Sequence, residues 1–573
     1  MAGMRHESES AYLRATLFGL GLLLLLRIGF LIASPLNLYA DEAQYWRWGE
    51  TLDWGYYSKP PMIAWVIHAV TSVFGNGEWA VRLAAPFLHT TGAVFLFLLG
   101  RAMYDARTGM FAAFGYALMP AVILSSAVIS TDGVLMPFWC AGLYAFWRLR
   151  SGEGRWASAV GLGVAVGAGF LSKYAMLYFL IGIGLTLVLD RDTRKALVSW
   201  HGLVALLVAA AIFAPHLAWN AANDFKTVSH TVDNANLGGD LFHPDHALDF
   251  LVDQMGVFGP ISLISLVFGL FVMRRSDAGL MGRDRWLLCF VIPVLVIILV
   301  QAVISRANAN WAVTAWPAAS VLVAAWLIRA QPNRSLWFWI AGLTFVALLL
   351  APDLDLWLRV LIGAAIAGSM IAYGHFQAYR PAGLLWTSFT AHAVLAAFFV
   401  TVTLLPAHMS TELGFDNAQK RTRGWDIAAT DVFRKAAELG ATSVLVDERE
   451  VWHGLDYYAR DRSVPLLSWR RYGVPKSFSE SVPLVPPLDE KVLVVSLHAE
   501  MRPMLRSDFN TFDSVGEIAI PLGTRSNGCP ITRRFHLYLA SGFAPDLHDD
   551  AWEKRHAGQS EFPSPPCPAP KDQ

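Results

Sequence analysis

The chain has 573 residues, of which 55% are hydrophobic and only 16% are charged. This balance excludes an ordinary soluble protein and indicates a membrane protein that crosses the bilayer several times. The formal net charge is zero, which gives the chain no general attraction to nucleic acid, and we expect no nucleic-acid partner.

Apolar segments recur along the first 405 residues. A bilayer span needs roughly 20 mostly apolar residues, so we predict a mainly α-helical membrane bundle of about thirteen spans. The fifth and sixth of these form a candidate broken pair around Lys173. The predicted spans are 14–34, 80–99, 110–128, 134–148, 157–172, 174–189, 197–214, 258–273, 286–304, 311–329, 336–351, 356–373 and 383–405.

Arginine and lysine gather in every second loop, for example at Arg148, Arg150 and Arg155. The positive-inside rule places these loops in the cytoplasm. The N-terminus, residues 1–13, is then cytoplasmic, and the segments 35–79, 215–257 and 406–573 are extracytoplasmic. Within the first of these segments, the short apolar stretch Met62–Phe74 predicts a helix lying along the membrane surface.

The composition changes after residue 405, where the chain becomes polar. We predict that residues 406–558 form a small α/β domain and that residues 559–573 are disordered. An amphipathic pattern predicts a helix at Trp425–Leu439, and short apolar runs predict strands at Thr442–Val446, Lys491–Leu497 and Phe535–Leu539. Cys529 and Cys567 lie in this tail and are free to form a disulfide if it is extracytoplasmic.

The first outward loop has the sequence NLYADEAQYWRWGETLDWGYYSKPP, residues 37–61. Its adjacent acids Asp41 and Glu42 suit general-base chemistry or cation binding. Lys59, beside tyrosines and before two prolines, suits a phosphate group at the membrane surface. The alternative is that these charges only keep an interfacial loop hydrated.

Other polar residues fall at the predicted outer ends of spans, where charges usually face a protein-lined cavity rather than lipid. For Asp132 the alternative is the N-cap of a helix. For Lys173 the alternative is a side chain that reaches to the membrane interface. No CxxC or HExxH pattern occurs, so no metal site is predicted. The residues of this set are Asp132, Lys173, His216, Asn220, Asn308 and Asn310.

At these residues the chain resembles the GT-C membrane glycosyltransferases, in particular the bacterial family-39 and family-83 proteins related to protein O-mannosyltransferases and to the lipid A aminoarabinose transferase. The resemblance is carried by DEAQYW, YYSKPPMIAW, EWAVRLAAP, STDG, GFLSKYAML, PHLAWNAANDF and NANWAVTAWP. It covers residues 15–330 well and the tail weakly.

The resemblance implies a GT-C fold over residues 14–405 and a hexosyl- or pentosyltransferase located in the bacterial inner membrane. It implies that a sugar is transferred, with inversion, from a polyprenyl-phosphate donor to an envelope glycolipid or glycan such as lipopolysaccharide. The reaction is expected on the outer face of the membrane, in contact with membrane lipid and without a cofactor. It assigns catalysis to Asp41, Glu42 and Asp132, and donor phosphate binding to Lys59, Tyr56, Tyr57 and Lys173. Acceptor or sugar binding is assigned to His216, Trp219, Asn220, Asn308 and Asn310.

Three alternatives remain at this stage. In these alternatives the chain is a flippase or transporter of lipid-linked sugars, a protein O-mannosyltransferase, or a non-catalytic envelope scaffold. Transporters place polar groups at the bilayer midplane and often contain repeats, whereas here the polar groups gather at one predicted face and no repeat is evident.

Overall fold

The computed structural model describes residues 2–233, 242–272, 278–349, 356–405, 409, 419–472, 475–485, 490–524 and 529–556. The chain forms two compact units, each built from separate segments. The first unit comprises Met1–Ile32, Asp53–Val66 and Arg82–Phe399, and the second comprises Ala33–Leu52, Ile67–Val81 and Val400–Gln573.

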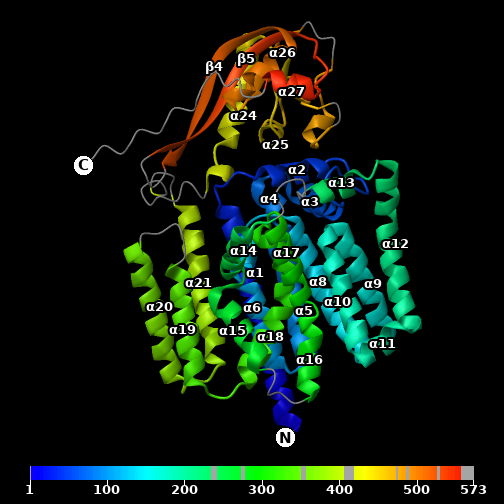
Figure 1. The fold of residues 1–573 in the computed structure, drawn as a ribbon, viewed down its shortest axis with the longest axis vertical. Helices are drawn as coiled ribbons and strands as arrows, with labels where there is room; N and C mark the ends of the chain where they lie inside the picture. The colour runs from blue at the N-terminus through cyan, green and yellow to red at the C-terminus, as the bar shows by residue number, and fades with distance from the viewer. Residues whose placement is uncertain are drawn as a thin grey trace. The chain divides into compact units, whose positions relative to one another are not determined.

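The first unit is a bundle of α-helices (Figure 1), and over the residues that the structure describes each predicted span lies mainly on helix. Its main helices are α1 (Ala2–Ala33), α5 (Ala84–Met103), α6 (Ala106–Ala117), α7 (Pro120–Ser125), α8 (Thr131–Arg150), α9 (Arg155–Ser172), α10 (Leu177–Leu189), α11 (Arg191–Leu197), α12 (Trp200–Ala222), α13 (Lys226–Asp233), α14 (Pro244–Phe258), α15 (Pro260–Val272), α16 (Ala278–Leu288), α17 (Ile292–Ile304), α18 (Trp316–Arg329), α19 (Arg334–Leu349), α20 (Leu356–Phe376) and α21 (Gly383–Leu404). Two short 3-10 helices, η1 (Tyr174–Met176) and η3 (Ala309–Ala315), interrupt the series.

The chain is a multi-pass membrane protein, although the predicted number of about thirteen spans is not confirmed. Within the described residues, eight helices are long and apolar enough to cross a membrane, or up to ten if each sharply bent pair is one span. Several predicted spans are short or broken. The predicted span 110–128, for example, is divided into α6 and α7, with Pro120 as the first residue of α7.

Glycines allow two pairs of helices in this unit to pack backbone against backbone. A Cβ on Gly100 of α5 would lie 2.7 Å from the Cα of Gly109 in α6. On α9, Cβ atoms on Gly163 and Gly167 would meet the carbonyl oxygens of Ala205 and Ala209 in α12 at 2.6 and 2.9 Å. Small residues four apart are the usual means of close helix packing in membranes, and here they fix α9 against α12 (Figure 1).

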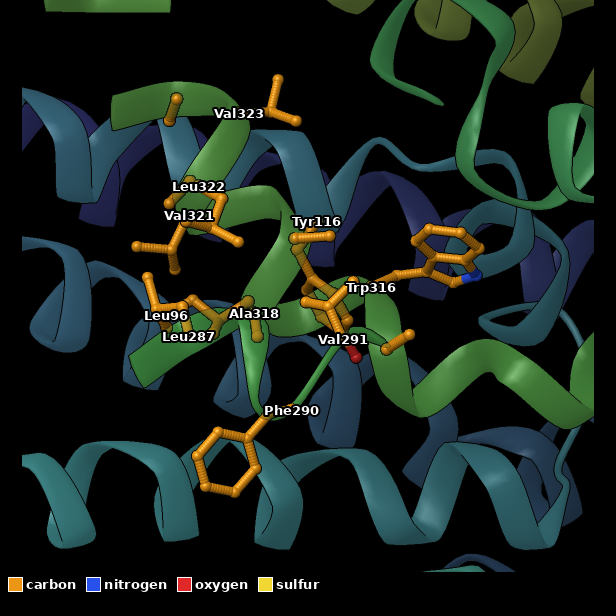
Figure 2. Close-up of a cluster of buried hydrophobic side chains, with 14 of the residues drawn as sticks. Leu96, Tyr116, Leu287, Phe290, Val291, Trp316, Ala318, Val321, Leu322 and Val323 are labelled. Carbon is orange, nitrogen blue, oxygen red and sulfur yellow. The ribbon is translucent and has the colours of Figure 1, made fainter. Parts of the chain in front are cut away.

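The core of the helical unit surrounds α18. Figure 2 shows Trp316, Val321 and Leu322 of this helix among side chains that come from several other helices, including Leu96 of α5 and Tyr116 of α6. All five side chains are fully buried. Arg27 of α1 donates to the carbonyl oxygen of Ala117, the last residue of α6.

The second unit contains a five-stranded sheet of order β2-β1-β3-β5-β4. Strands β1, β2 and β3 are parallel, and the long hairpin of β4 and β5 (Figure 1) adds an antiparallel edge. Its elements are α24 (Trp425–Leu439), β1 (Ser443–Val446), α25 (Arg449–Tyr458), β2 (Leu466–Ser468), β3 (Val492–Ser496), α26 (Arg502–Ser507), β4 (Phe509–Thr524), β5 (Pro530–Phe543) and α27 (Asp550–His556).

The second unit also includes α2 (Ala40–Gly49) from the first outward loop. The helix α3 has the predicted bounds Met62–Phe74, and α4 (Glu78–Arg82) follows it. Cys529 is disulfide-bonded and Cys140 and Cys289 are free thiols. Cys567 and the predicted disordered tail 559–573 lie outside the described residues.

Candidate functional site

Asp41 and Glu42 lie in the first turn of α2, a separate helix that begins after the irregular stretch 34–39. Sequence analysis placed Asp41 in the first outward loop, and in the structure this part of the loop is helical. Glu42 is 2% exposed, and its Oε2 accepts from the backbone nitrogen of Tyr39 at 2.9 Å. This bond satisfies an amide at the helix start. Glu42 therefore stabilises α2, and the two adjacent acids have different environments.

Asp41, Gln44 and Arg449 form a group that we call the Asp41 cluster. Nη2 of Arg449 donates to Oδ1 of Asp41 at 2.9 Å, and Nη1 donates to Oε1 of Gln44 at 2.6 Å. The Asp41 side chain is 57% exposed and the Arg449 side chain 43% exposed. The guanidinium fork thus orients one carboxylate oxygen while the aspartate stays accessible to water.

Helix α25 supplies Arg449 and also anchors α2 within the second unit. Trp46 of α2 packs edge-on against Tyr457 of α25, with ring centroids 5.0 Å apart. Arg47 of α2 lies 3.5 Å from the buried carboxylate of Asp456, which also pairs with Arg462 at 2.8 Å. These buried contacts fix the helix that carries Asp41 far more firmly than the exposed Asp41–Arg449 pair does.

Asp132, Lys173 and Asn310 form a second group, the Asp132 cluster, in the helical unit. Nζ of Lys173 lies 2.7 Å from Oδ1 of Asp132, and Nδ2 of Asn310 donates to Oδ2 at 2.8 Å. The cap of α8 is Ser130, which accepts from the backbone of Gly133. The helix-cap interpretation of Asp132 is therefore wrong. Both of its oxygens instead join α8 to the end of α9 and to η3.

His216, Asn220, Tyr174 and Trp54 form a third group, the His216 cluster. Nδ1 of His216 lies 2.7 Å from the carbonyl oxygen of Trp54. A carbonyl oxygen only accepts, so Nδ1 carries a proton, and Nε2 accepts from the hydroxyl of Tyr174 at 2.7 Å. Asn220 donates to the same Nε2 at 3.0 Å. Both ring nitrogens are thus engaged within the protein, which indicates a positioning role for this buried histidine.

The segment from Asp53 to Lys59 is held against α12. Nε1 of Trp219 donates to Oδ2 of Asp53 at 2.7 Å. The indole of Trp219 also covers Gly55, where a Cβ would approach the ring to 2.4 Å. The backbone nitrogen of Tyr56 donates to the carbonyl oxygen of Lys59 at 3.1 Å, and burial raises the pKa of the Tyr56 hydroxyl to about 12. The Tyr56 hydroxyl therefore stays protonated near neutral pH, and Lys59 is the last residue of a turn closed by its own carbonyl oxygen.

Comparison with known proteins gives related matches from a family model and from individual proteins. A family model described as dolichyl-phosphate-mannose-protein mannosyltransferase matches residues 58–219. The chain is also 30% identical over 455 residues to the lipid A galacturonosyltransferase RgtD of Rhizobium johnstonii, covering 79% of this chain and 84% of that protein.

The chain belongs to the GT-C superfamily of membrane glycosyltransferases. It is a glycosyltransferase that uses a lipid-phosphate-linked sugar. The undecaprenyl phosphate-aminoarabinose arabinosyl transferase of Pseudomonas aeruginosa is 27% identical over 34% of this chain and 39% of that protein. The chain also shares its fold with the crystal structure of ArnT from Cupriavidus metallidurans bound to undecaprenyl phosphate, with a TM-score of 0.62. The superposition covers 92% of this chain and 98% of that one, at 16% sequence identity.

The structure of this glycosyltransferase brings together several residues predicted from sequence. Asp132, Lys173 and Asn310 meet in one cluster, and His216 and Asn220 meet in another, whereas Asn308 is exposed at the start of η3. Tyr57 is half-buried in the turn before Lys59. Sequence analysis did not identify Gln44, Asp53, Tyr174 or Arg449, and Arg449 lies more than four hundred positions from the aspartate it contacts.

Proposed function

We propose that this glycosyltransferase transfers a galacturonic acid residue from a polyprenyl-phosphate donor to the lipid A part of lipopolysaccharide. The observation that carries this proposal is the match to the lipid A galacturonosyltransferase, which extends over 79% of this chain. A lipopolysaccharide core galacturonosyltransferase from the same organism is also 30% identical, over 46% of this chain. Both relatives transfer the same sugar, which favours it over aminoarabinose.

We assign the central chemical role to Asp41. An acceptor hydroxyl attacks the anomeric carbon from the face opposite the phosphate, the bond from that carbon to the phosphate oxygen breaks, and the hydroxyl proton passes to the carboxylate. The configuration is inverted. Glycosyl transition states carry positive charge on the sugar ring, which a nearby carboxylate stabilises. Because Arg449 holds Oδ1, we assign Oδ2 of Asp41 to the acceptor hydroxyl.

We assign the leaving phosphate to Lys59. Negative charge grows on the phosphate oxygen as the sugar departs, and an ammonium group at that position stabilises the transition state more than the ground state. Tyr56 keeps its proton and Tyr57 lies in the same turn, so their hydroxyls are further candidate donors. Lys173 is paired with Asp132, and we therefore assign it to the support of the site rather than to the phosphate.

We place the reaction on the outer face of the bacterial inner membrane. Support comes from the alternation of arginine-rich loops, which puts residues 35–79 and the tail outside under the positive-inside rule. Compartment-specific reporter fusions after Leu52 and after Ala407 test this assignment. A cytoplasmic signal at either position would contradict it.

Mass spectrometry of lipid A and core tests the proposed reaction. A deletion strain is expected to lose the mass of one or more hexuronic acid residues, and the wild-type gene should restore that mass. Loss of an aminopentose or a hexose would assign a different sugar. Unchanged lipopolysaccharide together with altered glycoproteins would favour the protein O-mannosyltransferase alternative.

Lys59→Ala tests the phosphate assignment. We expect transfer to fall about 10²-fold with a higher KM for the lipid donor, because one charge-assisted contact to phosphate is lost. Lys59→Arg keeps the charge and should retain part of the rate. Wild-type kinetics in Lys59→Ala would contradict the assignment.

A further inference from the structure

A groove with a volume of about 440 Å³ lies along α8 and is lined also by residues of α5 and α9. Sites for small molecules usually have volumes of roughly 300–1,000 Å³. Thr91 of α5 and Val164 of α9, which belong to its lining, are exposed. Both of these helices are long and apolar enough to cross a membrane. The groove therefore opens toward the lipid that surrounds the bundle.

Small residues spaced four apart leave the room for this groove. Ala141 and Ala145 contribute from α8 and Gly161 from α9, and a Cβ on Gly161 would lie 3.6 Å from the Cβ of Ala145. The rings of Phe95 in α5 and Tyr144 in α8, with centroids 6.2 Å apart, add aromatic surface. Most of the wall is thus hydrocarbon, which suits an apolar chain.

The length of the groove matches one leaflet of a bilayer. Its lining on α8 extends from Pro137 to Arg148, and at about 1.5 Å per residue this distance is about 16 Å. The hydrocarbon core of a bilayer is about 30 Å thick, so one leaflet contributes about 15 Å. An acyl chain of a phospholipid has this depth available to it.

One end of the groove is cationic. The guanidinium carbon of Arg148 lies 5.7 Å from the centroid of the Tyr144 ring. Its Nε is buried and makes no hydrogen bond within the described residues, since Oε2 of Glu153 lies 3.6 Å away, beyond hydrogen-bond distance. Arg155 lies beside the same turn, where its Nη2 would be 3.4 Å from a Cβ on Gly152. The Glu153 side chain is 61% exposed, so it is free to turn into water when an anion approaches Arg148.

The cationic end lies at the level of lipid headgroups. Trp156 follows Arg155 and is 58% exposed, and tryptophan is enriched at membrane–water interfaces. The positive-inside rule places this turn between α8 and α9 on the cytoplasmic side, in keeping with the orientation proposed above. Anionic lipids are concentrated in that leaflet and attract basic residues near its surface.

We propose that this groove binds one anionic phospholipid of the cytoplasmic leaflet, with an acyl chain along α8 and its phosphate at Arg148 and Arg155. Basic pockets between membrane helices are suited to anionic headgroups, and arginine forms paired hydrogen bonds with phosphate oxygens. The same helix carries Asp132 in its first turn, so a bound lipid supports the helix on which the Asp132 cluster is built. Its expected effect is thermal stabilisation of the whole protein.

The test is native mass spectrometry of the full-length protein, purified and delipidated in detergent. Dioleoyl phosphatidylglycerol and dioleoyl phosphatidylethanolamine have the same acyl chains and differ in charge. The first equivalent of phosphatidylglycerol is expected to bind about tenfold more tightly than phosphatidylethanolamine and to raise the melting temperature. Glycerol phosphate, which lacks acyl chains, should not bind at the same concentration.

Two variants, each with a matched control, decide the assignment. Arg148→Gln should remove most of the preference for phosphatidylglycerol, and Ala141→Phe should fill the groove and abolish binding of the first equivalent of either lipid. Arg285→Gln and Ala364→Phe, at an exposed arginine in α16 and an exposed alanine in α20, should bind as the wild type does. Melting temperatures without lipid check that each variant is folded.

Equal binding of the two lipids by the wild type, or an unchanged preference in Arg148→Gln, would overturn the proposal. Undecaprenyl phosphate should bind in addition to phosphatidylglycerol. If it displaces phosphatidylglycerol, the groove belongs to the sugar donor and the proposal is wrong. None of these readouts involves catalysis, so they stand apart from the proposed sugar transfer.

Discussion

The Asp41 cluster and the Asp132 cluster are built from the same kinds of group, an aspartate, a cation and a side-chain amide, but they differ in exposure and in bonding. Asp132 is 14% exposed, and its two oxygens accept from Lys173 and Asn310. Asp41 is 57% exposed, and its Oδ1 accepts from Arg449, whose other nitrogen bonds to Gln44. In one cluster the amide donates to the aspartate, whereas in the other it accepts from the arginine.

This difference separates a structural aspartate from a reactive one. A carboxylate whose oxygens are both engaged by the protein is costly to disturb and has little capacity left for a substrate. An exposed carboxylate held through one oxygen is oriented but still available. We therefore assign the chemistry to Asp41 and the support of the helix ends to Asp132, although the family resemblance assigned catalysis to both.

The largest expected effect comes from Asp41→Asn. Transfer should fall by about 10²–10⁴-fold, because the amide neither takes the proton nor stabilises the charged ring. Folding should be preserved, because an exposed ion pair contributes roughly 0–1 kcal/mol. The measurement is the initial rate of transfer from a radiolabelled polyprenyl-phosphate sugar in membranes.

Asp431→Asn is the matched control for that variant. Asp431 lies in the same unit and forms an ion pair with Arg434 at 2.6 Å, and no part of the proposed chemistry involves it. It should leave the rate unchanged. A normal rate in Asp41→Asn would reverse the assignment of the two clusters.

Asp132→Ala should act mainly on stability. The substitution leaves the ammonium of Lys173, which is 24% exposed, without its carboxylate partner. Removing one member of a buried ion pair destabilises a protein by roughly 3–5 kcal/mol, and we expect the lower end of this range because the lysine is partly exposed. The measurement is the melting temperature of the detergent-purified protein. The double variant Asp132→Leu/Lys173→Met should recover much of the loss. A stable but inactive Asp132→Asn would instead identify Asp132 as a catalytic group.

Arg449→Ala should reduce the rate about tenfold and leave stability within roughly 1 kcal/mol, because it frees an exposed carboxylate to rotate. Arg449→Lys should be intermediate, since an ammonium lacks the fork that bonds Asp41 and Gln44 together. The same assay, with kcat and KM determined separately, measures both variants. Arg434→Ala is the control at an exposed arginine, and equal rates in all three would show that Arg449 does not position Asp41.

The smallest expected effect concerns pH. Burial raises the pKa of the Asp447 carboxyl to about 7, and the nearby Glu448 adds to the rise, although Ser496 donates to the carboxylate at 2.5 Å. The folded protein therefore retains a proton that the unfolded chain has lost. Stability should fall as pH rises from about 4 to about 7 and change little above that, with a loss of roughly 1–2 kcal/mol between pH 5.5 and 7.

Melting curves across this pH range measure the effect, and Asp447→Asn should flatten them. Asp447 precedes α25, so the Asp41 cluster should be more sensitive to pH than the Asp132 cluster. A pH dependence that is unchanged in Asp447→Asn would assign it to another group.

Much of the helical unit could be predicted from hydropathy, because a span must bury its backbone polar groups within one helix. Over the described residues each predicted span lies mainly on helix, and Met62–Phe74 and Trp425–Leu439 have the predicted bounds. The breaks between helices were harder to predict, because they depend on local features such as Pro120. The strand β4 was missed, since its pairing with β5 contains irregularities near Gly516 and Gly523 that disturb the alternation of side chains.

The candidate site was predictable only where a motif lies within one stretch of sequence. The first-loop acids and Lys59 stand out because of unusual neighbours, but the pairing of Asp41 with Arg449 is a tertiary contact with no local signal. The different environments of Asp41 and Glu42 follow from the position at which α2 begins, which neighbouring residues alone do not reveal. His216 and Trp219 were assigned to the sugar, and the structure shows that they also hold the segment Asp53–Gly55 through packing and hydrogen bonds.

The residues that complete the Asp41 cluster are also separated in time during synthesis. Asp41 and Arg449 are 408 positions apart in the chain. At 5–20 residues per second, a ribosome needs about 20–80 s to reach Arg449 after it has made Asp41. For that interval the membrane helices emerge while the aspartate has no arginine partner. A chain that stops before α25 never gains one, so synthesis of the membrane helices alone does not produce a finished site.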